Sequence, residues 1–393
     1  MKFSHFSDVH IGGWREPELK ELGIKSFELG IKKSIEENVA FVIIAGDLFD
    51  TSLPSIDLIK GVASILKKLK DHDISCYVIP GSHDFSPSGK TMLDVLERAG
   101  LVENVMKLKD NKLEFTEDKT GVKLTGFYGR KGGLEISEYR TVDFSNLENE
   151  KSFKIFLFHT LFSELKPKEF EMMSTESISL LPKYFDYYAG GHPHFVFNKE
   201  IENYGVVAYP GPTFPNNFKE LEELGCGGFF IVEVKDNKVV TKHHKLSLKE
   251  VKSYLLNAEN KTPLELEDTI INSVKNFNDK ILTFRIEGCL KDGEPSDIDF
   301  NKIFSTFKDA YYILKNTSKL TSKDVKELNY KGENVNDVEN EIINELLENK
   351  EFDIDFVKTL INNLDKEKNE GEKISDFEDR VIKDVKELLK IDN

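Results

Sequence analysis

Short apolar runs alternate with amphipathic stretches over the first 245 residues of this 393-residue chain. Phe41–Ala45 and Ile74–Ile79 are short β-rich runs, and between them apolar residues recur at helical spacing from Ile56 to Leu69. This strand–helix–strand order predicts parallel strands with covering helices. It also places functional loops at the carboxyl ends of the strands.

The later strands are joined by shorter connections. Apolar runs predict them over residues 123–128, 154–158, 184–189 and 206–209, and a hairpin with strands at 228–235 and 238–244 closes the region. Short connections favour a mixed sheet or a two-sheet sandwich over a purely parallel sheet. We therefore expect an α/β fold in which a mixed-sheet sandwich is flanked by helices.

The pattern changes after residue 245. Helix-like stretches at 264–274 and 300–307 are each followed by a strand-like run, at 281–286 and 310–314. This order predicts a compact αβαβ unit. The expected organisation is therefore a large domain at 1–245, a small αβ domain at 246–330 and a C-terminal tail at 331–393.

The tail carries apolar residues at helical spacing, from Val338 to Leu347 and again from Ile374 to Leu388. A charged linker over 365–373 precedes the last of these stripes. We expect two helical arms joined by a solvated linker. Their apolar faces need a partner, which is either the other arm or another chain.

Composition limits the class of protein. The chain lacks an apolar run long enough to span a membrane, and its N-terminus does not resemble a signal peptide. Cys76, Cys226 and Cys289 are widely separated, which indicates reduced thiols in a cytoplasmic protein. The net charge of −16 argues against a basic surface, but half of it lies from Lys319 onward, where 21 acidic residues outnumber 13 basic ones. Charge alone therefore does not exclude a nucleic-acid substrate.

Histidine and aspartate residues follow five of the apolar runs. Five of the nine histidines lie at these strand ends, with Asp or Gly beside most of them, which is hard to obtain by chance. Imidazole and carboxylate groups gathered at one edge of a sheet indicate a metal site. The motifs are, in order, Asp8-Val9-His10, Gly46-Asp47, Gly81-Ser82-His83-Asp84, His159, and Gly191-His192-Pro193-His194.

Each motif alone is also compatible with a purely structural role. Asp8 and His10 are two residues apart, so in extended backbone their side chains point the same way and can meet one metal, but a capping Asp beside an incidental His is the simpler account. Asp47 adds a carboxylate, although a strand-end turn with Asp50 capping the next helix would account for that motif too. Asp84 is expected to orient His83 and favour its protonated form, which suits contact with a phosphate oxygen.

The order of the motifs resembles that of the calcineurin-like metallophosphoesterases: Asp-x-His, Gly-Asp, Gly-Asn-His-Asp, His, Gly-His-x-His. Longer strings resemble the SbcD/Mre11 branch, the DNA double-strand-break nucleases. They are FSHFSDVHIG at 3–12, GDLFD at 46–50, and YPGPT at 209–213 before GFFIVEV at 228–234. The resemblance covers about residues 1–245 and extends to the αβ unit, which would be the family's DNA-capping domain. The tail matches by position alone.

The resemblance implies a centre for two divalent cations, with Mn²⁺ suiting the mixed imidazole and carboxylate ligands in this family. Two such ions, about 3.5–4 Å apart, polarise a phosphodiester and activate a water. His83 would contact the scissile phosphate and assist the leaving oxygen, steadied by Asp84. The implied ligands are Asp8, His10 and His194 for one ion, Asp47 as the bridge, and Ser82, His159 and His192 for the other.

Ser82 departs from the family pattern, which has Asn at this position. A serine hydroxyl is a weaker ligand on a shorter arm than an amide oxygen, and it can reach the ion through a water. We therefore expect the second ion to be held more loosely and the nuclease activity to be weakened.

The resemblance implies a Mn²⁺-dependent DNA exo/endonuclease that acts in DNA end processing and double-strand-break repair. The resemblance implies a homodimer whose C-terminal helices bind an SbcC/Rad-fifty type coiled-coil ATPase. Two alternatives stay open: a catalytically weak DNA-end-binding scaffold, which Ser82 motivates, and a phosphatase or phosphodiesterase on the same core. The αβ unit and the tail favour the nuclease, because a small-substrate enzyme needs neither.

Overall fold

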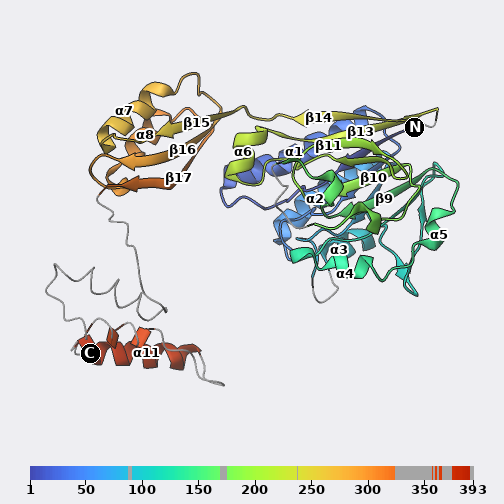
Figure 1. Ribbon diagram of the computed structural model, residues 1–393, viewed down its shortest axis with the longest axis horizontal. Helices are drawn as coiled ribbons and strands as arrows, with labels where there is room; N and C mark the ends of the chain where they lie inside the picture. Colours follow the sequence, from blue (N-terminus) through green and yellow to red (C-terminus); the bar gives the residue numbers. More distant parts are fainter. Residues whose placement is uncertain are drawn as a thin grey trace. The chain divides into compact units, whose positions relative to one another are not determined.

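Two six-stranded sheets lie face to face and carry the larger part of the fold (Figure 1). The computed structural model describes residues 1–86, 91–168, 175–236, 238–323, 356, 359–360, 363–364 and 374–389. The first sheet has the order β14 (Lys238–Leu246), β13 (Gly227–Lys235), β1 (Lys2–Phe6), β2 (Phe41–Ala45), β3 (Ser75–Ile79), β4 (Glu103–Asn104). The second has the order β11 (Phe197–Ile201), β12 (Gly205–Tyr209), β10 (Tyr187–Gly191), β9 (Lys154–His159), β8 (Lys123–Gly126), β7 (Thr116–Glu117).

Both sheets mix parallel and antiparallel pairs, as the short connections predict. Strands β1, β2, β3 and β4 are parallel, and β13 pairs antiparallel with β1. In the second sheet β8, β9, β10 and β12 are parallel, whereas β11 and β7 run antiparallel at the two edges. The mixed-sheet sandwich is confirmed.

Strand β2 shows why its sequence is a continuous apolar run. Phe41, Ile43 and Ala45 lie in the core between the two sheets, whereas Val42 and Ile44 pack on the opposite side against helices. A strand buried on both faces needs apolar residues at every position.

Helices α1 (Pro17–Glu36), α2 (Ile56–Asp71) and α3 (Met92–Arg98) cover the outer face of the first sheet. The short helices α4 (Glu135–Tyr139) and α5 (Ser145–Glu148) contribute to the core outside the second sheet, and a small hairpin, β5 (Leu108–Lys109) and β6 (Lys112–Leu113), lies nearby in sequence.

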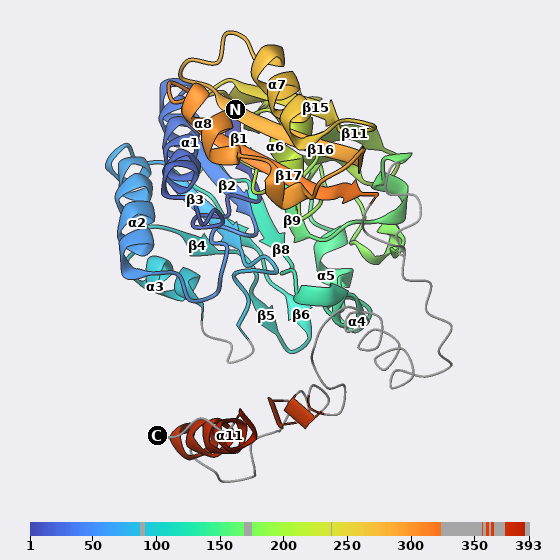
Figure 2. The same cartoon turned by 90° about the vertical axis from the view of Figure 1, so that its left-hand side faces the viewer.

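A small parallel sheet follows β14 (Figure 2). Strands β15 (Val251–Asn257), β16 (Ile281–Leu290) and β17 (Tyr312–Ser322) alternate with helices α7 (Pro263–Ser273) and α8 (Phe300–Thr306) and enclose a core of their own. The expected αβαβ unit is therefore βαβαβ, because β15 was missed. Its sequence mixes Lys, Ser and Asn with apolar residues and three of its seven residues are exposed, so the apolar run is weak. The expected boundary at 245/246 falls just before the end of β14.

The αβ domain belongs to the same compact unit as the sandwich, Met1–Ser322. Helix α6 (Phe218–Leu224) lies between them, because Leu221 on α6 packs with Ile281 of β16 and Leu19 of α1 in one buried cluster. The second unit, Lys323–Asn393, contains α11 (Ile374–Leu389), which confirms helical structure for the last apolar stripe. The other tail stripe, 338–347, lies outside the described residues. In the described part of the chain, no helix combines the length and apolar character needed to cross a membrane.

Candidate metal centre

The predicted site residues meet where the carboxyl ends of parallel strands from both sheets come together. Asp8 and His10 follow β1, Asp47 follows β2, and the 82–84 segment follows β3. His159 is the last residue of β9, and His192 and His194 follow β10. Parallel strands end at the same edge of a sheet, so five motifs far apart in sequence converge on one place.

Left-handed backbone aims several of these side chains. The φ angles of Asp8, His10, Asp47, His192 and His194 are +51°, +45°, +52°, +97° and +39°. Each such residue costs on the order of 1–3 kcal/mol, so the surrounding structure must hold it, and such strain concentrates at functional sites. The expectation that Asp8 and His10 share a face of extended backbone is wrong. They converge because β1 ends at Phe6 and both residues take left-handed turns beyond it.

Asp8, His10 and His194 form the first ligand group, with their candidate ligand atoms within 4.8 Å of one another. Nε2 of His10 lies 3.0 Å from Nε2 of His194, which in turn is 3.6 Å from Oδ1 of Asp8. Two imidazole nitrogens bound to one ion lie about 3 Å apart, because each metal–nitrogen bond is about 2.1 Å long. The spacing therefore fits a shared cation.

The second group contains Asp8, Asp47 and His159, again within 4.8 Å. Oδ2 of Asp47 lies 3.0 Å from Nε2 of His159 and 3.6 Å from Nε2 of His10, so this oxygen stands between the two groups. The Ser82 hydroxyl donates a hydrogen bond of 3.3 Å to the same oxygen. Gly46 permits this arrangement, since its φ is +85° and a Cβ there would lie 2.2 Å from Nδ1 of His159.

Hydrogen bonds fix the ring orientation of three of these histidines. Nδ1 of His10 donates to Asp50 at 3.1 Å, Nδ1 of His194 donates to Glu220 at 2.9 Å, and Nδ1 of His159 donates to the carbonyl of Ala45 at 2.8 Å. A ring whose Nδ1 carries the hydrogen presents the Nε2 lone pair on its other side. All three Nε2 atoms face the Asp8 and Asp47 carboxylates, which is the tautomer that a metal ligand needs.

The carboxylates and imidazoles of this ligand set shift one another's pKa values. Burial opposes a charge on His159, but Asp47 outweighs that effect and raises the pKa of this imidazole to about 10. Burial likewise opposes a charge on His194, yet the hydrogen bond to Glu220 and the nearby Asp8 raise its pKa to about 9. Burial alone would raise the pKa of Asp47, but His159 and His10 hold it well below its usual range. Binding a cation at Nε2 would displace these protons.

The residues fit a pair of divalent cations. Asp8 and Asp47 are 1% and 2% exposed. Burying a carboxylate costs several kcal/mol unless positive charge or good hydrogen bonds compensate it. The neighbouring imidazoles turn Nε2 toward these carboxylates, so a cation bound at Nε2 would supply the compensation that these residues need. In the described residues, the two groups share Asp8, and Oδ2 of Asp47 in the second group also lies 3.6 Å from Nε2 of His10 in the first.

His192 lies at the edge of this centre. Its backbone N–H donates to Oδ1 of Asp8 at 2.8 Å, and its ring packs against His159 with centroids 5.3 Å apart. Burial, and then the charge of His159, lowers its pKa to about 4, so the ring is neutral. Among the described residues, the groups that meet within 4.8 Å do not include it. A neutral imidazole beside His159 is suited to join the second group when an ion occupies it.

Asp50, and not Asp84, holds the ring of His83. Nδ1 of His83 donates to the backbone carbonyl of Asp50 at 2.6 Å, and the Asp50 carboxylate lies 3.7 Å away. The expectation that Asp84 orients His83 is therefore corrected. The Asp84 carboxylate instead accepts backbone N–H groups of Leu48, Phe49 and Gly81 at 3.0, 3.0 and 3.2 Å, tying the β2 and β3 loops together. Burial and the Asp47 charge raise its pKa to about 6.

Asp50, His10 and His83 form a third group within 4.8 Å. Both rings turn Nδ1 toward Asp50 and donate to its oxygens, so their lone pairs point elsewhere. In this group Asp50 accepts hydrogen bonds from two imidazoles, and the group is not arranged to bind a metal. Asp50 does not cap the next helix, because that helix, α2, begins at Ile56 and its N-cap residue is Ser55.

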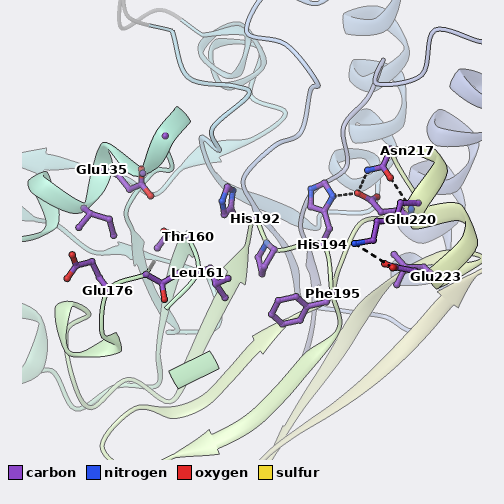
Figure 3. Close-up of a pocket in the computed structure, with 17 residues that line it drawn as sticks. Glu135, Thr160, Leu161, Glu176, His192, His194, Phe195, Asn217, Glu220 and Glu223 are labelled. Atoms are coloured by element: carbon purple, nitrogen blue, oxygen red, sulfur yellow. Dashed lines mark hydrogen bonds and ion pairs between the residues drawn. The ribbon is translucent and has the colours of Figure 1, made fainter. Parts of the chain in front are cut away.

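Sequence reasoning missed two carboxylates, Asp50 and Glu220. Asp50 lies inside the GDLFD string, three residues after Asp47, so its position could have suggested a role in the site. Glu220 follows Asn217 by three residues, a spacing that signals the start of a helix but not a contact with His194. Figure 3 shows Glu220 between His194 and Asn217, beside a cleft of about 760 Å³ that His192 and His194 also line.

The fold and this centre define a metallophosphoesterase. Residues 1–196 match the family model described as calcineurin-like phosphoesterase, and the chain belongs to that family. Within it, the chain is similar to archaeal proteins of the Mre11 type. A "DNA double-strand break repair protein Mre11" from Methanococcus maripaludis is 27% identical over 93% of this chain and 95% of that protein.

Two further relatives carry the same description. The protein from Methanocaldococcus jannaschii is 26% identical over 80% of both chains. The protein from Archaeoglobus fulgidus is 28% identical over 57% of this chain, and the match covers 52% of that relative's length. The similarity to the proteins from Methanococcus maripaludis and Methanocaldococcus jannaschii extends well beyond the family model and includes the αβ domain.

Proposed function

We propose that this chain is a Mn²⁺-dependent DNA nuclease that processes DNA ends in double-strand-break repair. The observation that carries the proposal is the pair of ligand groups that share Asp8 and are linked by Oδ2 of Asp47, with His83 held beside them by Asp50. Support for DNA as the substrate comes from the relatives named above and from the αβ domain, which a phosphatase acting on small substrates does not need.

The chain's own residues have distinct tasks in this reaction. Two bound cations would polarise the phosphodiester and lower the pKa of the attacking water. Asp50, Glu220 and the Ala45 carbonyl orient the ligand imidazoles, and Asp47 holds the two ligand groups together. His83 has a side chain that is 35% exposed and donates through Nδ1 to Asp50, so its Nε2 is the atom that can face a scissile phosphate. In its imidazolium form, with a hydrogen on both ring nitrogens, it would deliver the Nε2 proton to the leaving oxygen.

Cleavage of linear DNA by the purified full-length chain with Mn²⁺ tests this proposal. We expect metal-dependent shortening of DNA that EDTA abolishes. Turnover of a generic aryl phosphodiester, measured in the same buffer, separates the nuclease from a phosphodiesterase on the same core. Activity on the small ester without cleavage of DNA would overturn the assignment of the substrate.

Replacing Ser82 by Asn is expected to tighten the second ion and raise DNA cleavage. The serine hydroxyl reaches Oδ2 of Asp47 at 3.3 Å, whereas an amide on a longer arm can present a carbonyl oxygen to the ion itself. A gain of about tenfold in Mn²⁺ affinity corresponds to one such additional ligand contact worth about 1.4 kcal/mol. Ser86→Asn, in the same loop segment, is the matched control. Unchanged Mn²⁺ affinity and activity in Ser82→Asn would show that the serine does not weaken the site.

The proposed partner is a coiled-coil ATPase of the SbcC type, bound through the C-terminal helices, with the nuclease subunit acting as a homodimer. Helix α11 supports this, since its apolar residues recur at helical spacing on an otherwise charged helix. Co-expression with such an ATPase should recover the full chain and lose a 1–330 truncation. Equal recovery of both chains would exclude the tail as the binding segment.

A further inference from the structure

Helix α6 connects the metal centre to the αβ domain. It is seven residues long, and Glu220 in its first turn accepts the hydrogen from Nδ1 of His194. Two neighbours hold that carboxylate: the side-chain amide of Asn217 at 2.5 Å and the backbone N–H of Asn216 at 2.8 Å. The position of a metal-ligand imidazole therefore depends on where α6 lies.

The same segment also reaches the partner of His10. The side-chain amide of Asn216 donates to Oδ1 of Asp50 at 3.2 Å, and that carboxylate oxygen accepts from Nδ1 of His10. Asn216 thus touches both carboxylates that orient the imidazoles of the first ligand group. A shift of this segment would move both supports together.

The other side of α6 is held by the αβ domain. Arg285 on β16 makes a bidentate ion pair with Glu222, with Nε donating to Oε1 at 3.1 Å and Nη2 donating to Oε2 at 2.5 Å. Its guanidinium also stacks over the ring of Phe218, 5.2 Å from the centroid. Both side chains of the ion pair are mostly buried, at 22% and 16% exposure, and a bidentate geometry fixes orientation as well as distance.

We propose that the αβ domain positions the metal ligand His194 through α6, with Arg285 and Glu220 as positioning residues. The contacts of Arg285 with Glu222 and Phe218 fix the position of α6. Glu220 on α6 then fixes the position of the His194 ring through its hydrogen bond to Nδ1. This inference rests on the metal centre proposed above and adds that the affinity for the ion depends on how the αβ domain is docked. Coupling of this kind is reciprocal, so a bound ion would in turn favour the docked position of the αβ domain.

Mn²⁺ titration, followed by the electron paramagnetic resonance of the free ion, tests this without using activity. Removing an outer carboxylate from a metal-ligating histidine typically costs about 10–100-fold in affinity, which is the loss expected for Glu220→Gln. Arg285→Met keeps the length of the side chain and removes the ion pair, and we expect about a tenfold loss. Arg285→Lys should restore part of it, because lysine keeps the charge but not the fork.

Two comparisons assign the effect to α6. Tyr311→Phe removes a different contact of the αβ domain with the sandwich, the 3.2 Å hydrogen bond from its hydroxyl to the Glu18 carbonyl on α1, and should leave Mn²⁺ affinity unchanged. The double variant Arg285→Met, Glu220→Gln should bind Mn²⁺ no more weakly than Glu220→Gln alone, since both act on one path. Thermal unfolding identifies a temperature at which every variant is folded.

Each outcome bears on the inference. Wild-type affinity in Arg285→Met, equal losses in Arg285→Met and Tyr311→Phe, or additive losses in the double variant would overturn it. A wild-type chain that binds no Mn²⁺ would instead remove the metal centre itself, so the two failures are distinguishable.

Discussion

His83→Gln should lower DNA cleavage by about 10²–10⁴-fold, the usual contribution of a positioned general acid. Glutamine keeps the polarity and approximate length of the side chain but cannot deliver a proton. The two ligand groups that share Asp8 do not include His83, so Mn²⁺ stoichiometry and DNA binding should stay at the wild-type level. Gel-based cleavage of linear DNA, with metal content measured on the same preparation, checks both parts.

The matched control is His72→Gln. His72 is exposed at the end of α2 and its Nδ1 bonds to the Lys68 carbonyl, away from the site. Full activity is expected for it. If His83→Gln cleaves DNA as fast as the wild type, the chain does not use His83 in catalysis. If neither protein cleaves DNA while both bind it, the scaffold alternative replaces the nuclease.

Asp47→Asn should have a comparably large effect through the loss of metal. Oδ2 of Asp47 lies 3.0 Å from Nε2 of His159 and 3.6 Å from Nε2 of His10, so one oxygen serves both ligand groups. An amide carries no charge to bind two cations. We expect fewer than two ions per chain and a fall in cleavage of about 1000-fold, equivalent to about 4 kcal/mol of transition-state stabilisation.

Asp268→Asn is the control for this charge change, since Asp268 is exposed on α7 in the αβ domain. Metal content by atomic absorption and the temperature of unfolding complete the measurement. A folded Asp47→Asn protein that keeps two ions and wild-type cleavage would contradict the bridging role of Asp47.

The strands of the site-bearing core were predictable because burial on both faces demands apolar residues along the whole strand. Phe41–Ala45 is apolar at every position since both faces of β2 are covered, and the predicted strand has the observed bounds. Strand β11 was missed for the opposite reason. It is an edge strand with the sequence FNKEI and exposed polar residues, so neither apolar content nor alternation marks it.

The identities of the candidate ligands were equally predictable, because imidazoles and carboxylates that follow five separate strands are brought to one place by the sheet topology. The carboxylates that orient these ligands were not predictable from the sequence. Glu220 is 26 residues from His194 in the sequence, and Asp50 is 40 residues from His10. Contacts at such separation depend on how loops pack, and an ordinary acidic residue on a short helix gives no local signal of them.

The amino-acid sequence by itself determined the paired-sheet core, the motif order and the list of residues able to bind metal. These properties follow from periodicity and side-chain chemistry, which are local. Tertiary structure alone decided that Asp84 braces two loops, that Asp50 holds His83, and that left-handed turns aim the Asp8 and His10 side chains. It also decided that α6 joins the αβ domain to His194, because that connection exists only where segments distant along the chain are packed together.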